Sequence, residues 1–237
     1  MTVIADYIGK SAVDNVRSAI DTAKNNEQYH ALLSLTEERA LDRAAKVDSG
    51  EITGRLAGVP FIAKDNFLTL GGTTTAASHI LENFSAPLQA TAIERLEAEG
   101  AICIGKANLD AFAHGGSTEN SAFGPTLNSA DQSRVAGGSS GGSAVVVALG
   151  IVPFALGSDT GGSIREPASF NGVVGVKPTY GTVSRYGVVA MASSTDTIGC
   201  FTTNADDAAL VMDVMAGRDA NDMTTLPDFF APTDVKP

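Results

Sequence analysis

Two glycine- and serine-rich loops set between apolar runs constrain the fold of this chain more than any other feature. The first loop, GGSSGGS at 137–143, leads into AVVVALG, and the second, SDTGGS at 158–163, follows IVPFALG and precedes IREPASFN. A flexible linker would lie in polar surroundings between domains, and these flanks are not polar. The alternation of apolar element, tight loop and helix start is typical of an α/β domain.

The N-terminal region shows helical periodicity. Residues 11–47 carry apolar side chains at three- and four-residue spacing, among them Val16, Leu32 and Leu35. This spacing predicts helices across the whole region, and Gly50 follows where they end.

Further elements follow from apolar runs and the glycines that close them. VPFIAKDNF at 59–67 predicts a short buried strand running into a polar turn, and the apolar face at 88–96 predicts a helix before a strand at 101–104. Periodicity is lost after about residue 217. We therefore expect one domain over residues 1–220 and an irregular tail over 221–237.

Charge and cysteine content limit the classes of function. The 237 residues include 16 Lys and Arg against 27 Asp and Glu, a net charge of −11 with the basic residues dispersed, which argues against gripping a nucleic-acid backbone. An RNA-linked role would need a basic partner.

Cys103 and Cys200 make no disulfide framework, and Cys103 lies in an apolar run that predicts the core. With no signal-peptide pattern or membrane-length apolar run, we expect the cytoplasm or an organelle matrix.

Residues 100–107 nearly match a phosphate-binding P-loop. Gly100, Gly105 and Lys106 have the required spacing, but Ala107 stands where the motif needs a hydroxyl for Mg²⁺. The four intervening residues are strand material rather than a loop of exposed amides. We reject this interpretation.

The first loop also matches the nucleophile elbow, G-x-S-x-G, in frames centred on Ser139 and on Ser140. An elbow hydrolase needs its histidine after the serine. All three histidines, His30, His79 and His114, precede both serines, so an elbow-ordered triad is excluded.

A lysine is the remaining base that could activate a serine. A lysine acts as a base only when neutral, so burial has to lower its pKa from about 10.4. Lys64 follows the apolar run at 59–63, which predicts that it lies inside the molecule at the end of a strand. The alternative is a surface lysine beside Asp65.

The second loop offers the better nucleophile. If Ile164 begins a helix, Ser163 lies at its N-terminus, where backbone N–H groups stabilise negative charge. Gly161 and Gly162 leave the backbone open to a substrate carbonyl, so successive N–H groups can form an oxyanion hole. The alternative is that Ser163 only caps the helix.

Together these residues resemble the amidase signature family along the stretch 137–181. The family uses a Ser-Ser-Lys triad, and by this resemblance Lys64 is the base, Ser139 the bridging serine and Ser163 the acylated serine. The family holds the bridging serine after a cis peptide bond, here Gly138–Ser139. It also implies an oxyanion hole of backbone N–H groups, substrate-binding residues and no metal in the chain. The hole would comprise Thr160, Gly161, Gly162 and Ser163, and the substrate-binding residues would be Gly115 and Thr160.

The resemblance implies an α/β fold with a mixed β-sheet flanked by helices. It is closest to the branch of A subunits of glutamyl-tRNA(Gln) amidotransferase, through TTAASHILENF in the 73–84 region, GGSTENSAFGPTLN at 115–128 and the stretch 185–219. That branch implies a glutamine amidohydrolase that forms a glutamyl ester and gives its ammonia to partner subunits B and C. ATP, Mg²⁺ and Glu-tRNA(Gln) would be handled by the partner, with no cofactor in this chain.

Two departures qualify the resemblance. His79, His114, Gly116 and Glu166 stand where lysine, methionine, serine and glutamine are expected, and His114 and Gly116 fall in the loop that lines the amide pocket in the family. Members of the branch run to about twice this length, which predicts an incomplete fold and an N-terminal half. A free-standing amidase and an inactive truncated fragment are the alternative functions.

Overall fold

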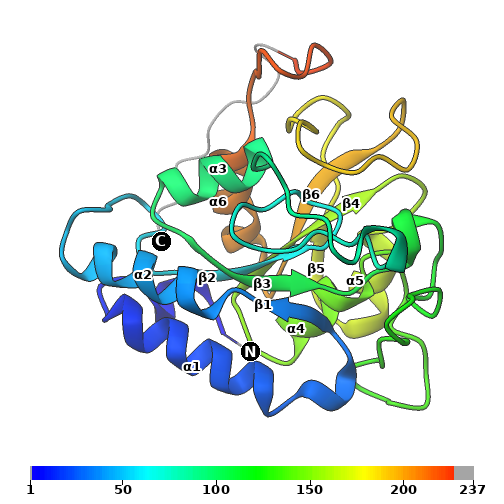
Figure 1. Cartoon of the computed structure of the whole chain (residues 1–237), viewed down its shortest axis with the longest axis horizontal. Helices are drawn as coiled ribbons and strands as arrows, with labels where there is room; N and C mark the ends of the chain where they lie inside the picture. The colour runs from blue at the N-terminus through cyan, green and yellow to red at the C-terminus, as the bar shows by residue number, and fades with distance from the viewer. Residues whose placement is uncertain (1, 227–237) are drawn as a thin grey trace.

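A six-stranded mixed sheet organises the chain (Figure 1). The structure is a computed structural model that describes residues 2–226. The strand order is β1-β3-β2-β4-β6-β5. The central strands β3, β2 and β4 pair in parallel, while β1, β6 and β5 pair antiparallel. The strands are β1 Leu32–Leu35, β2 Pro60–Lys64, β3 Ile102–Ala107, β4 Phe154–Asp159, β5 Val174–Val176 and β6 Thr197–Thr202.

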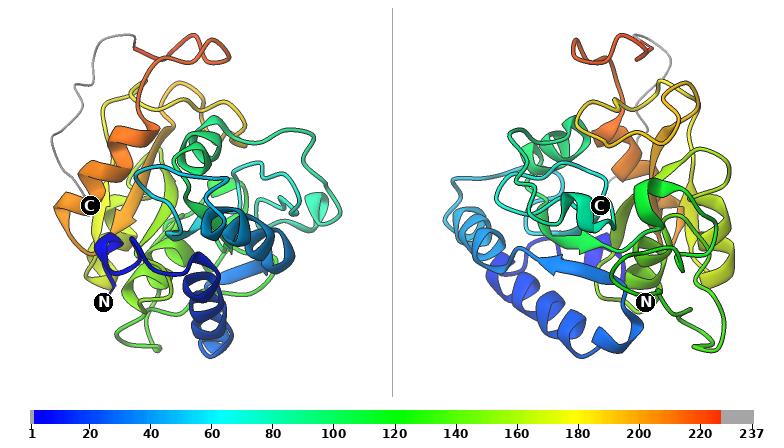
Figure 2. Two further views of the ribbon diagram at one scale, coloured as in Figure 1. Left: turned by 90° about the vertical axis from the view of Figure 1, so that its left-hand side faces the viewer. Right: turned by 45° about the vertical axis from the view of Figure 1, so that its right-hand side comes forward.

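Helices cover both faces of this sheet, as the views in Figures 1 and 2 show. One core cluster joins α3 and α6 to one face, and a second joins α1, α2, α4 and α5 to the other. Phe61 and Phe154 stack in the first cluster, whereas the intervening Ile62 belongs to the second, as strand alternation requires. The expected α/β fold with a mixed sheet is confirmed. The α-helices are α1 Ala12–Lys24, α2 Glu37–Asp48, α3 Thr91–Ala98, α4 Gly141–Ala148, α5 Arg165–Asn171 and α6 Ala205–Met215, and short 3₁₀ helices are η1 Ile4–Asp6, η2 Glu27–Tyr29, η3 His79–Leu81 and η4 Ala111–Ala113.

The prediction of helices throughout 11–47 is wrong in its middle. Leu32 and Leu35 lie in β1, which pairs with Ala107 and Gly105 of β3 rather than continuing a helix. His30, with φ of 50°, turns the chain out of the preceding 3₁₀ helix. The three-residue spacing of these leucines fits a helix face, but pairing with a strand some 70 residues later decides the conformation, and no local pattern reports it.

Other predicted elements are confirmed. β2 and β3 form where buried strands were expected, and α3 ends before Gly100, whose φ of 83° suits a helix stop. Cys103 and Cys200 are free and fully buried, and burial raises their pKa values to about 11 and about 12. In the described part of the chain, no helix is long and apolar enough to cross a membrane.

The end of the described chain is irregular but attached to the body. Asp222 accepts an N–H from Arg185 at 2.9 Å, and the Leu226 N–H donates to the Gly181 carbonyl at 3.0 Å. Of the expected tail over 221–237, residues 227–237 lie outside the described residues. The domain boundary at 220 stays a prediction.

Candidate active site

The carboxyl ends of two parallel strands bring the candidate residues together. β2 ends at Lys64 and its neighbour β4 ends at Asp159, with Ala63 opposite Leu156. Parallel neighbours finish at the same edge of a sheet, so the loops that follow them meet there. The Gly/Ser loop before α4 completes the site.

Lys64 lies wholly inside this site. Its side chain has no solvent exposure, and Nζ lies 2.7 Å from Ser139 Oγ, 3.0 Å from Ser158 Oγ and 3.4 Å from the Ser158 carbonyl oxygen. Burial lowers the pKa of the Lys64 amine to about 7, against the opposing effect of Asp110, Asp159 and Asp196. The prediction of a buried lysine is confirmed and the surface alternative is wrong. A neutral amine is therefore accessible near neutral pH.

A second buried lysine shows why Lys64 is unusual. Lys106, on the neighbouring strand, is also fully buried, but its Nζ lies 2.9 Å from Asp65 Oδ1 and donates to the Phe67 carbonyl at 2.7 Å. Lys64 has no carboxylate partner within ion-pair distance in the described chain, and its hydrogen-bond partners are uncharged. Of the two lysines, Lys106 is paired with a carboxylate and Lys64 is not.

The loop that carries Ser139 is held by close backbone packing. The Gly138–Ser139 peptide bond is cis, as the resemblance implied, and Ser139 is fully buried. A Cβ at Gly138 would lie 2.2 Å from Asp110 Oδ2 and 2.7 Å from the Ser117 nitrogen. Glycine is required here because this loop packs directly on the turn at 117–118. GGSSGGS is thus a packed, ordered loop.

Ser163 meets the same loop through its backbone. The Ser140 N–H donates to the Ser163 carbonyl at 3.2 Å, and Ser163 is 7% exposed. Its Oγ makes no hydrogen bond to another described residue, Ser139 included. The helix begins two residues later at Arg165 with Ile164 as N-cap, so the capping alternative for Ser163 is wrong.

The loop at 160–163 is open on the side that a substrate would approach. A Cβ built at Gly161 or Gly162 would meet no atom within 4 Å. The Gly162 N–H, however, already donates to Asp159 Oδ1 at 2.9 Å. Among the described residues, the N–H groups of Gly161 and Ser163 have no acceptor, so these two are available to an oxyanion.

Asp159 holds this loop in shape. Its buried carboxylate accepts the N–H groups of Gly162, Ile164 and Arg165 and pairs with the Arg165 guanidinium at 2.9 Å. Burial opposes ionisation, but the hydrogen bonds from Arg165 and the backbone outweigh it and hold the pKa of Asp159 below its ordinary value. Asp159 therefore acts as the ionised centre around which the Ser163 turn folds.

The predicted substrate-binding residues are Thr160, in the second loop, and Gly115, in the segment that packs on Asp110. Thr160 Oγ1 donates to Asp196 Oδ1 at 2.6 Å, which fixes its side chain. Gly115 is exposed, and a Cβ there would lie 2.3 Å from Asp110 Cγ. Gly116 and Glu166, two of the positions that differ from the expected residues, lie close together, since a Cβ at Gly116 would lie 3.4 Å from Glu166 Oε2.

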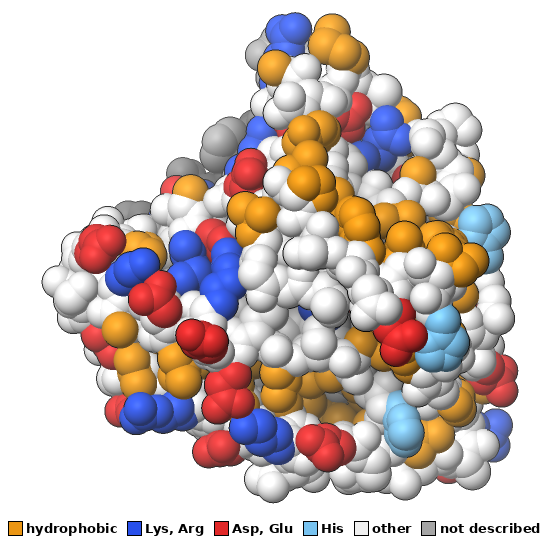
Figure 3. Space-filling model, viewed as in Figure 1, with side chains coloured by type: hydrophobic (Ala, Val, Ile, Leu, Met, Phe, Trp, Pro, Cys, Tyr) orange, Lys and Arg blue, Asp and Glu red, His pale blue; other side chains and the backbone are white. Residues whose placement is uncertain are grey.

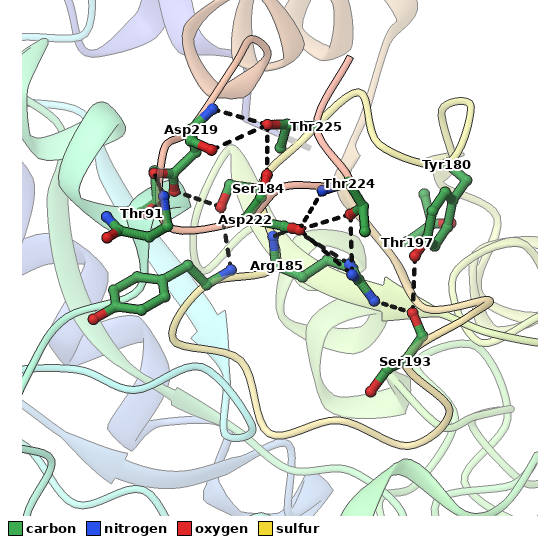
Figure 4. A network of polar contacts seen from close by, with 12 residues as sticks. Thr91, Tyr180, Ser184, Arg185, Ser193, Thr197, Asp219, Asp222, Thr224 and Thr225 are labelled. Carbon is green, nitrogen blue, oxygen red and sulfur yellow. Dashed lines mark hydrogen bonds and ion pairs between the residues drawn. The ribbon is translucent and has the colours of Figure 1, made fainter.

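A further polar network anchors the segment after α6 (Figure 4). Asp219 accepts the hydroxyls of Thr91 and Ser184, each at 2.6 Å, and Asp222 pairs with Arg185 at 3.4 Å. The Arg185 guanidinium also reaches the Ser193 carbonyl, in the loop that leads to Asp196. Residues 219–226 are thereby tied to the segment that positions Thr160.

Sequence reasoning missed several polar residues of the site. The sequence predicts a loop at Ser158 and Asp159, but these residues end β4 and contact Lys64 and the Ser163 turn. Asn66, which donates to Ser158 Oγ at 3.0 Å, lies in the polar turn that follows the apolar run at 59–63. The sequence signal that could have identified these residues was their polarity directly after apolar runs. Among the described residues, no cluster of three or more His, Cys, Asp or Glu could hold a metal ion.

Comparison with known proteins agrees with this geometry. A family model described as Amidase matches residues 14–236. The A subunit of glutamyl-tRNA(Gln) amidotransferase from Gloeobacter violaceus is 56% identical over 92% of this chain and 45% of its own length, and that of Limosilactobacillus fermentum is 53% identical over 96% and 48%. The chain thus spans about half the length of the curated relatives it matches.

Solved structures match over similar shares. The structure of the corresponding A subunit from Thermotoga maritima superimposes with a TM-score of 0.86 at 45% identity, covering 95% of this chain and 49% of that one. The peptide amidase of Stenotrophomonas maltophilia gives 0.87 at 33%, covering 98% and 50%. A family model over nearly the whole sequence and close relatives of the same fold lead to one conclusion: the chain belongs to the amidase family.

Proposed function

We propose that this chain hydrolyses an amide through Lys64, Ser139 and Ser163, and that its substrate is glutamine. The observation that carries the proposal is the buried Lys64 amine, free of any carboxylate partner in the described chain and 2.7 Å from Ser139 Oγ. A pKa of about 7 leaves much of this amine neutral at physiological pH, as a general base requires.

The reaction begins at Ser163. Its Oγ attacks the side-chain carbonyl carbon of glutamine, while its proton passes to Ser139 and the Ser139 proton passes to Lys64 Nζ. The N–H groups of Gly161 and Ser163 hold the oxyanion, with the Thr160 N–H beside them, while the Gly162 N–H stays bound to Asp159 Oδ1. The relay requires a Ser163–Ser139 hydrogen bond, and catalytic hydrogen bonds of this kind often form only in the complex with substrate.

The tetrahedral intermediate then collapses. The C–N bond breaks, the leaving nitrogen takes the proton back from Lys64 through Ser139, and ammonia departs. A γ-glutamyl ester remains on Ser163, and water hydrolyses it by the same proton path to glutamate. The nucleophile, the proton relay and the oxyanion donors of each step are groups of this chain.

The relatives support a place in a larger enzyme. Curated proteins 50–56% identical to this chain are named as the A subunit of glutamyl-tRNA(Gln) amidotransferase, so the ammonia would pass to partner subunits B and C. There ATP and Mg²⁺ would activate Glu-tRNA(Gln), and the chain would work in the cytoplasm or an organelle matrix. The net charge of −11 agrees with tRNA being held by a partner.

A free-standing amidase is the second candidate. The peptide amidase and a protein described with an s-triazine catabolic enzyme match with TM-scores of 0.87 and 0.93 at 33% and 38% identity. The fold is therefore compatible with other amides. Co-purification with B and C subunits would support the amidotransferase, and its absence with turnover of simple amides would favour the alternative.

Covalent labelling tests the triad without depending on glutamine binding. A neutral alkyl fluorophosphonate reacts with an activated serine: the serine oxygen bonds to phosphorus and fluoride leaves. We expect one adduct, mapped by mass spectrometry to Ser163 and absent from Ser163→Ala. The labelling rate should rise with pH through about 7, as Lys64 loses its proton. An adduct on another serine, or a rate independent of pH, would overturn the proposal.

A further inference from the structure

The three hydrogen-bond partners of Lys64 Nζ are unevenly shared between two serines. Ser139 supplies one, its Oγ at 2.7 Å, and Ser158 supplies two, its Oγ at 3.0 Å and its carbonyl oxygen at 3.4 Å. Ser158 is 4% exposed and lies near the end of β4, beside the lysine. The proposed relay leaves this serine without a role.

Counting protons shows what Ser158 decides. A neutral primary amine has two N–H donors and one lone pair, and an ammonium has three donors and none. The Ser158 carbonyl only accepts, so it takes one N–H. If Ser158 Oγ takes the second, the lone pair is left for the Ser139 hydroxyl, and the relay can run.

The opposite arrangement would stop the relay. If the Ser158 hydroxyl donated to the lone pair, the second N–H of Lys64 would point at Ser139 Oγ, and Ser139 could no longer pass its proton to the amine. The direction of the Ser158 hydroxyl therefore decides whether Lys64 is a base toward Ser139.

Asn66 supplies the group that can settle this direction. Its Nδ2 donates to Ser158 Oγ at 3.0 Å and to the Val189 carbonyl oxygen at 3.5 Å, which fixes the orientation of the amide. A hydroxyl oxygen has two lone pairs, so Ser158 Oγ can accept one N–H from Asn66 and one from Lys64 at the same time. With Asn66 donating to it, Ser158 Oγ is held as an acceptor.

We propose that Ser158, held by Asn66, is a positioning residue that receives two protons of Lys64 and so directs its lone pair at Ser139. After proton transfer, the same two oxygens of Ser158 and Ser139 Oγ accept the three protons of the ammonium, which favours the transfer. The inference rests on the proposed function, because it concerns the same relay.

Removing the hydroxyl gives opposite results under the two arrangements. In Ser158→Ala an acceptor for the ammonium is lost, so we expect the pH midpoint of Ser163 labelling to fall by about 1 to 2 units. The plateau rate should fall about tenfold or more, with half-saturating probe concentration unchanged. If Ser158 instead donates to the lone pair, its removal raises the midpoint and speeds labelling, and that result would overturn the inference.

The Ser158→Ala substitution leaves the other charges near Lys64 unchanged. Asp110, Asp159 and Asp196 act on its pKa, and the Asp65–Lys106 pair lies on the adjoining strands. None of them contacts Ser158 Oγ, so a changed midpoint reports the lost hydroxyl. Ser158→Thr keeps the oxygen and should restore the wild-type midpoint.

A second buried serine provides the matched control. Ser143 on α4 donates its hydroxyl to the β4 carbonyl of Leu156 at 2.8 Å and does not contact Lys64. Ser143→Ala should change stability without moving the midpoint. If wild-type Ser163 is not labelled, the proposed function fails. If it is labelled and Ser158→Ala keeps the wild-type rate and midpoint, only the role of Ser158 fails.

Discussion

Lys64 and Lys106 lie on adjacent strands, both without solvent contact, yet their surroundings make them chemically different. Lys106 shares its charge with Asp65 at 2.9 Å, and Lys64 contacts only neutral oxygens. A carboxylate at contact distance favours the ammonium, whereas burial alone favours the amine. The surroundings of the two lysines thus differ by one carboxylate neighbour.

Replacing Lys64 tests its role as a base. We expect Lys64→Ala to slow labelling of Ser163 by about 10²–10⁴-fold, the usual contribution of a general base. Lys64→Arg should be no better, because a guanidinium is not deprotonated in proteins. Labelling kinetics at pH 8 measure both, and circular dichroism confirms folding. A near-normal rate in the arginine variant would exclude Lys64 as the base.

Replacing Lys106 should affect stability instead. Lys106→Met leaves the Asp65 carboxylate buried without its cation, which costs about 3–5 kcal/mol in free energy of unfolding. Adding Asp65→Asn should recover much of this loss, because the second charge is then removed as well. Urea unfolding of the single and double variants measures the coupling. Equal losses in both would show that the pair is not the stabilising contact.

At the scale of elements, the turn from β4 into α5 depends on one carboxylate. Asp159 binds three N–H groups and the Arg165 guanidinium across a seven-residue span. Two further hydrogen bonds support the turn, from the Ser140 N–H to the Ser163 carbonyl at 3.2 Å and from Thr160 Oγ1 to Asp196 Oδ1 at 2.6 Å. Asp159 makes the largest number of polar contacts that hold Ser163 in position.

Asp159→Asn should loosen this turn. We expect a loss of about 1.5–3 kcal/mol in free energy of unfolding, the usual value for hydrogen bonds to a charged group, and slower labelling of Ser163. The pKa of Asp159 is lowered in the fold, so its stabilisation is full above the ordinary value of 3.8 and is lost as pH falls below it. The gap between wild type and variant should accordingly be full at pH 7 and close in acid.

An exposed aspartate provides the control for this variant. Asp131 accepts contacts from Ser133 and Arg134 on the surface, where ion pairs contribute little. Asp131→Asn should leave unfolding and labelling near wild-type values. A gap for Asp159→Asn that persists unchanged at pH 3 would show that its charge is not responsible.

At the scale of the whole molecule, the surface divides into charged and apolar areas. Figure 3 shows acidic and basic side chains interspersed at the lower left and hydrophobic side chains gathered in a band toward the upper right. An apolar hollow is lined by Leu68, Leu81, Phe84, Leu88, Tyr186, Gly187, Val188 and Val189. Ile80, next to Leu81 in the chain, is 83% exposed. Contiguous apolar surface of this kind favours association.

We therefore expect the purified chain to self-associate. Phe84→Asp, which places a charge in the hollow, should shift the molecule toward the monomer in light scattering coupled to size-exclusion chromatography. Met223→Asp is the control, because Met223 is 82% exposed and does not line the hollow. A monodisperse monomer of the unmodified chain at high concentration would contradict the prediction.

The sequence by itself indicated most of the local elements and the residues that could carry the chemistry. Apolar runs indicated β2 and β3, glycines indicated where helices stop, and the paired Gly/Ser loops with Lys64 indicated a serine hydrolase without histidine. Each of these signals is local, because strand burial, helix stops and loop chemistry depend on neighbouring residues.

The tertiary structure alone decided the rest. Leu32 and Leu35 became a strand because β3 offered an edge to pair with, and Lys64 acquired its low pKa because the packed strands and loops around it exclude water. The same packing brought Ser158 to Lys64 and tied the Gly162 N–H to Asp159. Desolvation and hydrogen bonding between distant segments depend on the packed arrangement, so no local pattern could have reported them.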